Sequence, residues 1–225
     1  MIKIQKLQPY DGELKKLYKD LGETIFDESG RGAILIATAH IDEYLTKLIE
    51  ANLPNTISKK ERDRLFKYPG AISSFSSKIE LSYCFRLIEK ELYDSLNTLR
   101  RLRNDAAHSS SKFDLYELNE KMKLVYKFNP HIYDFIQKTS RNQIVKSKIA
   151  AIEKALKETL PQIDNDINPE EYLNKPENQQ IIEEQLPYWE MLNGLCLICS
   201  IIVYKAETIK EILKDIETWD DLKQD

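Results

Sequence analysis

Arginine, asparagine and histidine stand close together in the chain as Arg103, Asn104 and His108. Together these residue types could cleave an RNA phosphodiester without a metal ion. Arginine can neutralise the phosphate with a planar fork of donors, and histidine can move a proton near neutral pH. Asparagine can orient the histidine or the phosphate by hydrogen bonding. We therefore take these three residues as the candidate catalytic residues.

RNA supplies its own nucleophile, the 2′-hydroxyl group. An enzyme must deprotonate this group, stabilise the phosphorane and protonate the leaving 5′-oxygen. His108 suits either proton transfer, because an unperturbed imidazole titrates at about pH 6.5. One histidine does not easily serve as both base and acid. The chemistry therefore predicts a two-fold homodimer that pools two motifs.

The spacing of Arg103 and His108 limits how the two side chains can meet. Five residues at about 100° each place them roughly 140° apart around an ideal helix. They converge in one chain only if the helix unwinds near Ala107, where the serine triplet 109–111 follows. Otherwise they meet across a dimer.

A structural alternative exists for the same motif. Arg103 would pair with an acidic side chain such as Asp42 or Glu43, and His108 would interact favourably with a helix C-terminus. For the other two histidines we predict no function: His40 should be buried and hydrogen-bonded in a helix, and His131 should be exposed after a proline.

The charge of the chain is unevenly distributed. Residues 158–184 hold eight acidic side chains and one lysine, and residues 185–225 hold eight acidic and four basic ones. Since the whole chain carries −4, residues 1–157 carry +7. Two basic clusters lie in that part, one at residues 98–112 and one made of Lys59, Lys60, Arg62, Arg64 and Lys67. Such clusters suit an anionic partner, although a solvated helix face is an equally good interpretation.

Composition indicates a reduced cytoplasmic protein with no membrane span. Three cysteines cannot all pair, and Cys196 and Cys199 lie in the apolar run 195–203, which is too short to cross a bilayer. We expect both to be core residues rather than a redox or metal motif, and we expect Cys84 to lie in a core-like helix. No metal-ligand cluster and no cofactor motif is present in the sequence, so we expect no cofactor.

Apolar residues recur at helical spacing along most of the chain, which predicts an all-α bundle. The helix after residue 90 should place Leu92, Leu96, Leu99, Leu102 and Ala106 inward. Ser58 and Glu61 form a capping-box pattern that begins a short basic helix, and Asp114 and Glu117 form another that begins a helix through Val125. The remaining predicted helices cover residues 11–26, 31–53, 76–88, 91–107, about 132 into the 150s, and 187–216. Residues 68–70 and about 161–180 are expected loops.

Three segments in order resemble the mannitol operon repressor family. They are Arg31-Gly32 with Ala39-His40-Ile41-Asp42, then residues 70–83 (GAISSFSSKIELSY), then residues 99–108 (LRRLRNDAAH). That family is all-helical and named for transcriptional regulation, without a recognisable DNA-binding motif. It belongs to the HEPN superfamily, whose signature is arginine, a polar residue, three variable positions and histidine. Many HEPN proteins are metal-independent endoribonucleases, often dimeric toxins or antiviral effectors, and others are interaction modules.

The chain departs from the repressor family at two places. Asn104 is the polar residue typical of active HEPN ribonucleases, where some repressor members carry an acidic residue. Residues 141–180 also form a longer segment than the family needs. The first departure favours activity, and the second leaves regulation open.

Two functions therefore follow from the sequence. The first is the binding or cleavage of RNA by a cytoplasmic homodimer through Arg103, Asn104 and His108. The chain would then be a single domain over residues 1–225, an HEPN-like helical bundle with additional C-terminal helices. Its core would span about residues 11–130 plus the final helix. The alternative is a non-enzymatic regulator that acts through a protein partner, with no sequence-specific DNA binding.

Overall fold

The computed structural model describes residues 11–28, 30–108, 119–159, 171 and 175–214 of the chain. This described part is predominantly helical and contains no strand, which confirms the all-α prediction. The helices are α1 (Asp11–Asp27), α2 (Gly30–Glu50), α3 (Lys59–Phe66), α4 (Phe75–Cys84), α5 (Lys90–His108), α6 (Asn119–Val125), α7 (Pro130–Thr159) and α9 (Pro176–Lys214).

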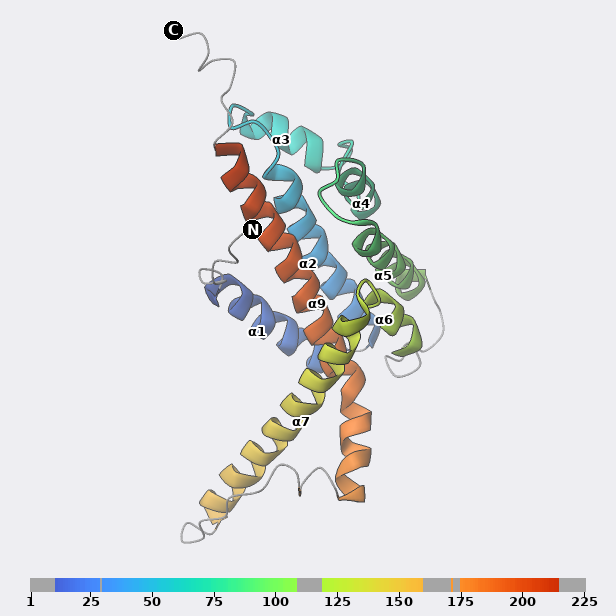
Figure 1. Cartoon of the computed structure of the whole chain (residues 1–225), viewed down its shortest axis with the longest axis vertical. Coiled ribbons are helices and arrows are strands. Elements are labelled where there is room, and N and C mark those ends of the chain that lie inside the picture. Colours follow the sequence, from blue (N-terminus) through green and yellow to red (C-terminus); the bar gives the residue numbers. More distant parts are fainter. Residues whose placement is uncertain (1–10, 29, 109–118, 160–170, 172–174, 215–225) are drawn as a thin grey trace.

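The centre of the bundle is a pair of helices far apart in sequence, α2 and the C-terminal part of α9 (Figure 1). Helix α1 packs against both, and α4 and α5 pack against α2. Helix α6 packs against α5. Helix α7 and the first part of α9 extend away from the bundle, and we call these two segments, residues 138–159 and 176–189, the arm.

Apolar periodicity predicted the core-facing side of the central helices. All five positions assigned inward on α5 are buried. On α2, Ile34, Thr38, Ile41, Leu45 and Leu48 recur at helical spacing and are buried as well. Burial of one apolar stripe per helix supplies most of the stability of such elements. The main core therefore fixes α5 firmly along its length.

The arm has a small core of its own. Ile144, Val145 and Ile149 of α7 pack with Ile182 and Leu186 of α9, and Trp189 packs against this cluster. This cluster is separate from the main core, to which Trp189 also contributes. The arm is therefore held together by its own apolar contacts.

The last helix begins earlier than predicted. Helix α9 starts at Pro176 rather than at residue 187, and Pro187 lies inside it. Residues 176–180, predicted as part of a loop, are thus helical. Proline in a helix interior removes one backbone hydrogen bond. Here Pro187 is buried beside Leu186 of the arm's core. Packing therefore keeps the chain helical before Pro187, although proline by itself predicts that a helix begins at this residue.

Helix α4 ends earlier than predicted, at Cys84 rather than at residue 88. Arg86 adopts the left-handed conformation with φ 58°. The Leu87 amide donates to the Ser82 carbonyl at 2.8 Å, and the Arg86 amide donates to the Tyr83 carbonyl at 2.9 Å. These are the two bonds of a Schellman motif, which stops a helix by satisfying its last carbonyls.

Helix α9 is long and apolar enough to cross a membrane by length and composition. Residues 195–203, the apolar run that we expected to be too short to cross a bilayer, are part of this longer helix. Most of the apolar stretch is buried inside the bundle. A core helix of a bundle has the same length and composition, so this feature by itself indicates nothing about a membrane.

Candidate functional site

Helix α5 positions the candidate residues by burying one face and exposing the other. Leu99, Leu102 and Ala106 of its C-terminal half are buried in the main core. The Ser95 hydroxyl donates to the Val125 carbonyl and so ties α6 to α5. Arg103 and His108 lie on the exposed side, and Asn104 is partly buried.

Arg103 has one polar contact in the described part of the chain. Its Nη1 donates to the Oδ1 of Asn104 at 3.2 Å, and it forms no ion pair with a described residue. A neighbouring amide orients the guanidinium without neutralising its charge. No carboxylate among the described residues therefore neutralises the positive charge of Arg103.

His108 is the last residue of α5, and the helix continues through it. Unwinding at Ala107, one of the two ways for Arg103 and His108 to converge, does not occur. Their side chains leave the helix about 140° apart. Within the described part of one chain, α5 therefore directs the two side chains apart.

The structural alternative for Arg103 is wrong in its named partners. Asp42 pairs with Lys78 at 2.8 Å, and Glu43 pairs with Lys47 at 3.4 Å. Both carboxylates are therefore used by other cations. For His108 the alternative fits, because it is the basic residue in the last turn of α5.

Further charges surround the motif. Arg101 is exposed, and Arg100 donates from Nε to the Oδ1 of Asn97 at 3.1 Å. Asp105 faces α6, where Lys121 lies 3.8 Å from its carboxylate. This half of α5 carries more positive than negative charge. Lys112, the serine triplet 109–111 and the capping pattern of Asp114 and Glu117 lie outside the described residues.

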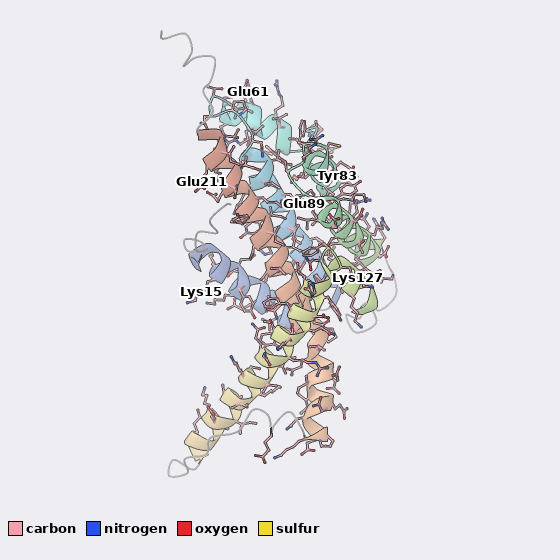
Figure 2. All side chains as sticks on the ribbon, viewed as in Figure 1. Lys15, Glu61, Tyr83, Glu89, Lys127 and Glu211 are labelled. Carbon is pink, nitrogen blue, oxygen red and sulfur yellow. The ribbon has the colours of Figure 1, made fainter. Side chains whose placement is uncertain are left out.

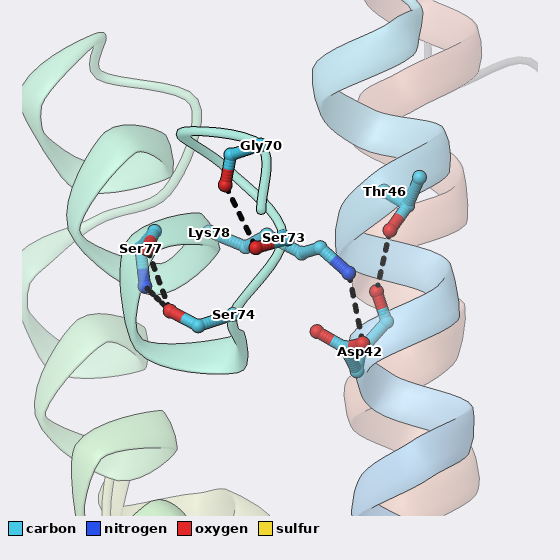
Figure 3. Close-up of polar contacts among 7 residues, drawn as sticks. All are labelled: Asp42, Thr46, Gly70, Ser73, Ser74, Ser77 and Lys78. Atoms are coloured by element: carbon cyan, nitrogen blue, oxygen red, sulfur yellow. Dashed lines mark hydrogen bonds and ion pairs between the residues drawn. The ribbon is translucent and has the colours of Figure 1, made fainter. Parts of the chain in front are cut away.

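Segment 70–83 contains the lysine of an ion pair that was not predicted from the sequence. Figure 3 shows Lys78 reaching from α4 to Asp42 on α2, beside Ser74, which caps α4 by accepting from the Ser77 amide at 3.0 Å. The Lys78 side chain is 6% exposed and that of Asp42 is 31% exposed. The Oδ1 of Asp42 is buried without a partner among the described residues. The only sequence signal was an acidic residue next to the core residue Ile41.

A second missed group is Glu190, a buried carboxyl at the root of the arm. It is 3% exposed, and its Oε1 has no hydrogen-bond partner in the described structure. Burial raises its pKa, and a hydrogen bond with Gln137 together with Lys123 and Arg141 opposes that effect. A lone glutamate inside the apolar stretch of α9 was the available signal.

The cysteines and the other histidines have structural environments. Cys199 is buried in the main core, as predicted, and Cys196 is partly buried against it. Burial raises the pKa of Cys196 to about 12 and raises that of Cys199 as well. Cys84 lies at the end of α4, a helix that buries Ile79 in the main core, and is itself exposed. His131 is exposed as predicted, whereas His40 is only partly buried.

No metal site is apparent in the described residues, where no group of three or more histidine, cysteine, aspartate or glutamate side chains is placed to hold an ion. Comparison with known proteins finds no matching family model, no matching curated protein and no matching solved structure.

Proposed function

We propose that this chain is an HEPN-type RNA-binding protein that acts, as a homodimer, as a metal-independent endoribonuclease. One observation carries the proposal. Arg103 and His108 are exposed at the same end of α5, and Arg103 has no carboxylate partner among the described residues. The acidic groups that could have neutralised it pair with Lys78 and Lys47. An exposed cation without a carboxylate partner can contribute to the attraction of an anionic ligand.

Each residue has a defined role in the proposed cleavage. A histidine takes the proton of the RNA 2′-hydroxyl, and the 2′-oxygen attacks the phosphorus. The bond from phosphorus to the 5′-oxygen breaks, and the 5′-oxygen receives a proton. The products are a 2′,3′-cyclic phosphate and a 5′-hydroxyl. Arg103 stabilises the charge on the non-bridging oxygens, and Asn104 holds its guanidinium in place.

The proposal requires two copies of the chain. Because α5 is continuous, Arg103 and His108 diverge within one chain. Two α5 ends related by a two-fold axis would place the arginine of one copy beside the histidine of the other. The same arrangement would supply two histidines, one as base and one as acid.

The test is RNA cleavage by the purified full-length protein in EDTA. We expect cyclic-phosphate ends, and we expect His108→Ala to lower the rate by about 10²- to 10⁴-fold, the usual contribution of a general acid or base. Arg103→Gln should lower it comparably. His131→Ala and Arg86→Gln are matched controls, because each removes an exposed side chain of the same type outside the motif.

Two outcomes would count against the enzyme. Equal cleavage by wild type and His108→Ala would show that the activity is not that of this site. A wild-type protein that binds RNA and leaves a broad panel uncut would be an RNA-binding protein without the proposed activity, whereas one that neither binds nor cuts RNA would favour the alternative regulator that acts through a protein partner.

A further inference from the structure

Helix α3 contributes no residue to the main core. None of its residues is buried. A capping box holds its first turn: the Ser58 amide donates to Glu61 Oε2 at 2.9 Å, and the Glu61 amide donates to Ser58 Oγ at 3.2 Å. Arg62 reaches back to Glu50 of α2 at 3.7 Å. Local contacts thus maintain a helix that lies mostly in solvent.

The basic side chains of α3 exceed the acidic groups that could pair with them. Glu61 is engaged in the capping box, and Asp63 pairs with Lys67 at 2.8 Å. Lys59, Lys60 and Arg64 are exposed and form no ion pair with a described residue. Because Lys60 and Arg64 are four residues apart, they lie on one face of the helix.

An exposed aromatic ring follows this basic helix directly. Tyr68 is 92% exposed, more than any other large apolar side chain in the described part. The chain turns sharply after it, since the Gly70 amide donates to the Lys67 carbonyl at 2.6 Å and the Ile72 amide to the Leu65 carbonyl at 3.1 Å. A Cβ on Gly70 would lie 2.3 Å from the Leu65 carbonyl oxygen, so only glycine permits this turn.

We infer that residues 58–70, which we call the α3 knob, bind single-stranded RNA. Lys59, Lys60 and Arg64 would contact phosphates, and Tyr68 would stack on an unpaired base. This combination of basic groups with an exposed aromatic ring is how proteins bind single strands. The choice of RNA over DNA rests on the proposed function, whereas the choice of a single strand rests on Tyr68.

The alternative anionic partner, a membrane surface, fits the knob less well. A helix that lies in a bilayer interface needs an exposed apolar face. The two apolar side chains of α3, Leu65 and Phe66, are partly buried rather than exposed. Tyr68 alone offers little apolar area. In Figure 2, Glu61 marks α3 at the end of the molecule opposite the arm, away from Lys127 beside α6. The knob is therefore a separate surface from the α5 motif.

The experiment is fluorescence anisotropy with a labelled 20-nucleotide oligouridine across a salt series. The combined change Lys59→Ala, Lys60→Ala and Arg64→Ala should flatten the salt slope by about 2, since each phosphate contact on a single strand contributes about 0.7. Tyr68→Ala should weaken binding roughly tenfold, and Tyr68→Trp should restore it. The controls are Lys138→Ala, Lys146→Ala and Lys154→Ala on α7, and Tyr204→Ala on α9, all exposed residues.

Further probes separate the possible ligands and the two proposals. Preference for a duplex, or binding to vesicles of anionic lipid without binding to oligouridine, would overturn the inference, as would knob variants that bind like wild type. Equal binding of oligothymidine would keep a single-strand site and remove its preference for RNA. If the knob variants lose binding but no variant or wild type cleaves RNA, the knob stands and the proposed endoribonuclease fails.

Discussion

Lys78 of α4 and Arg103 of α5 are both cations on helices that pack against each other, yet their environments differ. Lys78 is almost wholly buried and bonds to Asp42 on a neighbouring helix. Arg103 is exposed and contacts only the amide of the next residue among those described. The difference separates a charge that joins two helices from a charge that remains available to a ligand.

The comparison also shows what neutralises positive charge inside the molecule. A charge removed from water must be paired, because an unpaired one is costly. Asp42 meets this need for Lys78, and the exposed Glu43 pairs with the partly exposed Lys47. Solvent meets the same need for Arg103. Removing each cation or its partner should therefore affect stability very differently.

The largest expected effect follows from removing the carboxylate of the buried pair. Asp42→Asn leaves the Lys78 ammonium buried without a counter-charge, so we expect the free energy of unfolding to fall by about 3 kcal/mol. Urea denaturation followed by circular dichroism measures this loss. The control is Glu43→Gln, which breaks a solvent-exposed pair on the same helix and should change stability by less than about 0.5 kcal/mol. A similar loss in both variants would remove the distinction between buried and exposed charge.

Removing the lysine instead should cost less. Lys78→Met leaves Asp42, whose side chain is 31% exposed and so retains some water, and we expect a loss of about 2 kcal/mol. Replacing both members, as in Asp42→Leu with Lys78→Met, should recover most of that stability, because well-packed apolar residues often replace a buried pair without loss. A double variant as unstable as the sum of the two single variants would show that the pair does not act as a unit.

Glu190 gives a prediction of the opposite sign. Its pKa is raised by burial, so its ionised form disfavours folding, and stability falls as the pH rises from about 4.5, the ordinary value, through the folded-state pKa. Glu190→Gln should raise the free energy of unfolding by on the order of 1 kcal/mol at pH 7. The gain should disappear below about pH 4.5, where both states of the wild type bind the proton. A gain that does not change with pH would mean that packing, and not charge, is responsible.

Variants of the exposed Arg86 test whether this residue affects stability only through its backbone conformation. Its left-handed conformation is unfavourable for a residue with a Cβ, so Arg86→Gly should stabilise the fold by about 1 kcal/mol. Arg86→Asn should gain less, and Arg86→Ala should be close to neutral. Melting temperatures of the three variants give the order. A loss of stability in Arg86→Ala would indicate that the guanidinium itself supports the fold.

Local patterns in the sequence predicted the helices but not all their ends. The capping box at Ser58 and Glu61 and the inward stripe of α5 are local signals, and both are confirmed. The end of α4 is set by local hydrogen bonds at Arg86, whose residue type does not signal a left-handed conformation. The start of α9 before Pro187 depends on packing between distant segments. Proline predicts a helix start because it lacks an amide hydrogen. That preference was overridden by contacts with α7 that the sequence does not show.

The candidate site was predictable in type and not in geometry. Residue types identified Arg103, Asn104 and His108, and helical periodicity predicted which neighbours face the core. The pairing of the carboxylates depends on how α2, α4 and α5 pack together. Spacing in the sequence therefore did not predict the Lys78–Asp42 pair or the lack of a partner for Arg103 among the described residues.

The smallest expected effect on stability is at the α5 motif itself. Arg103→Gln and His108→Ala each remove an exposed side chain, so each should change the free energy of unfolding by less than about 0.5 kcal/mol. This near-zero change is far smaller than the loss of about 3 kcal/mol expected for Asp42→Asn. It supports a functional role for the two residues only if the same variants also lose the proposed RNA cleavage. Urea denaturation and cleavage assays on the same preparations supply both measurements. A stability loss near 2 kcal/mol for Arg103→Gln would place this arginine with Lys78 as a residue that the fold requires, and the case for an available charge would fail.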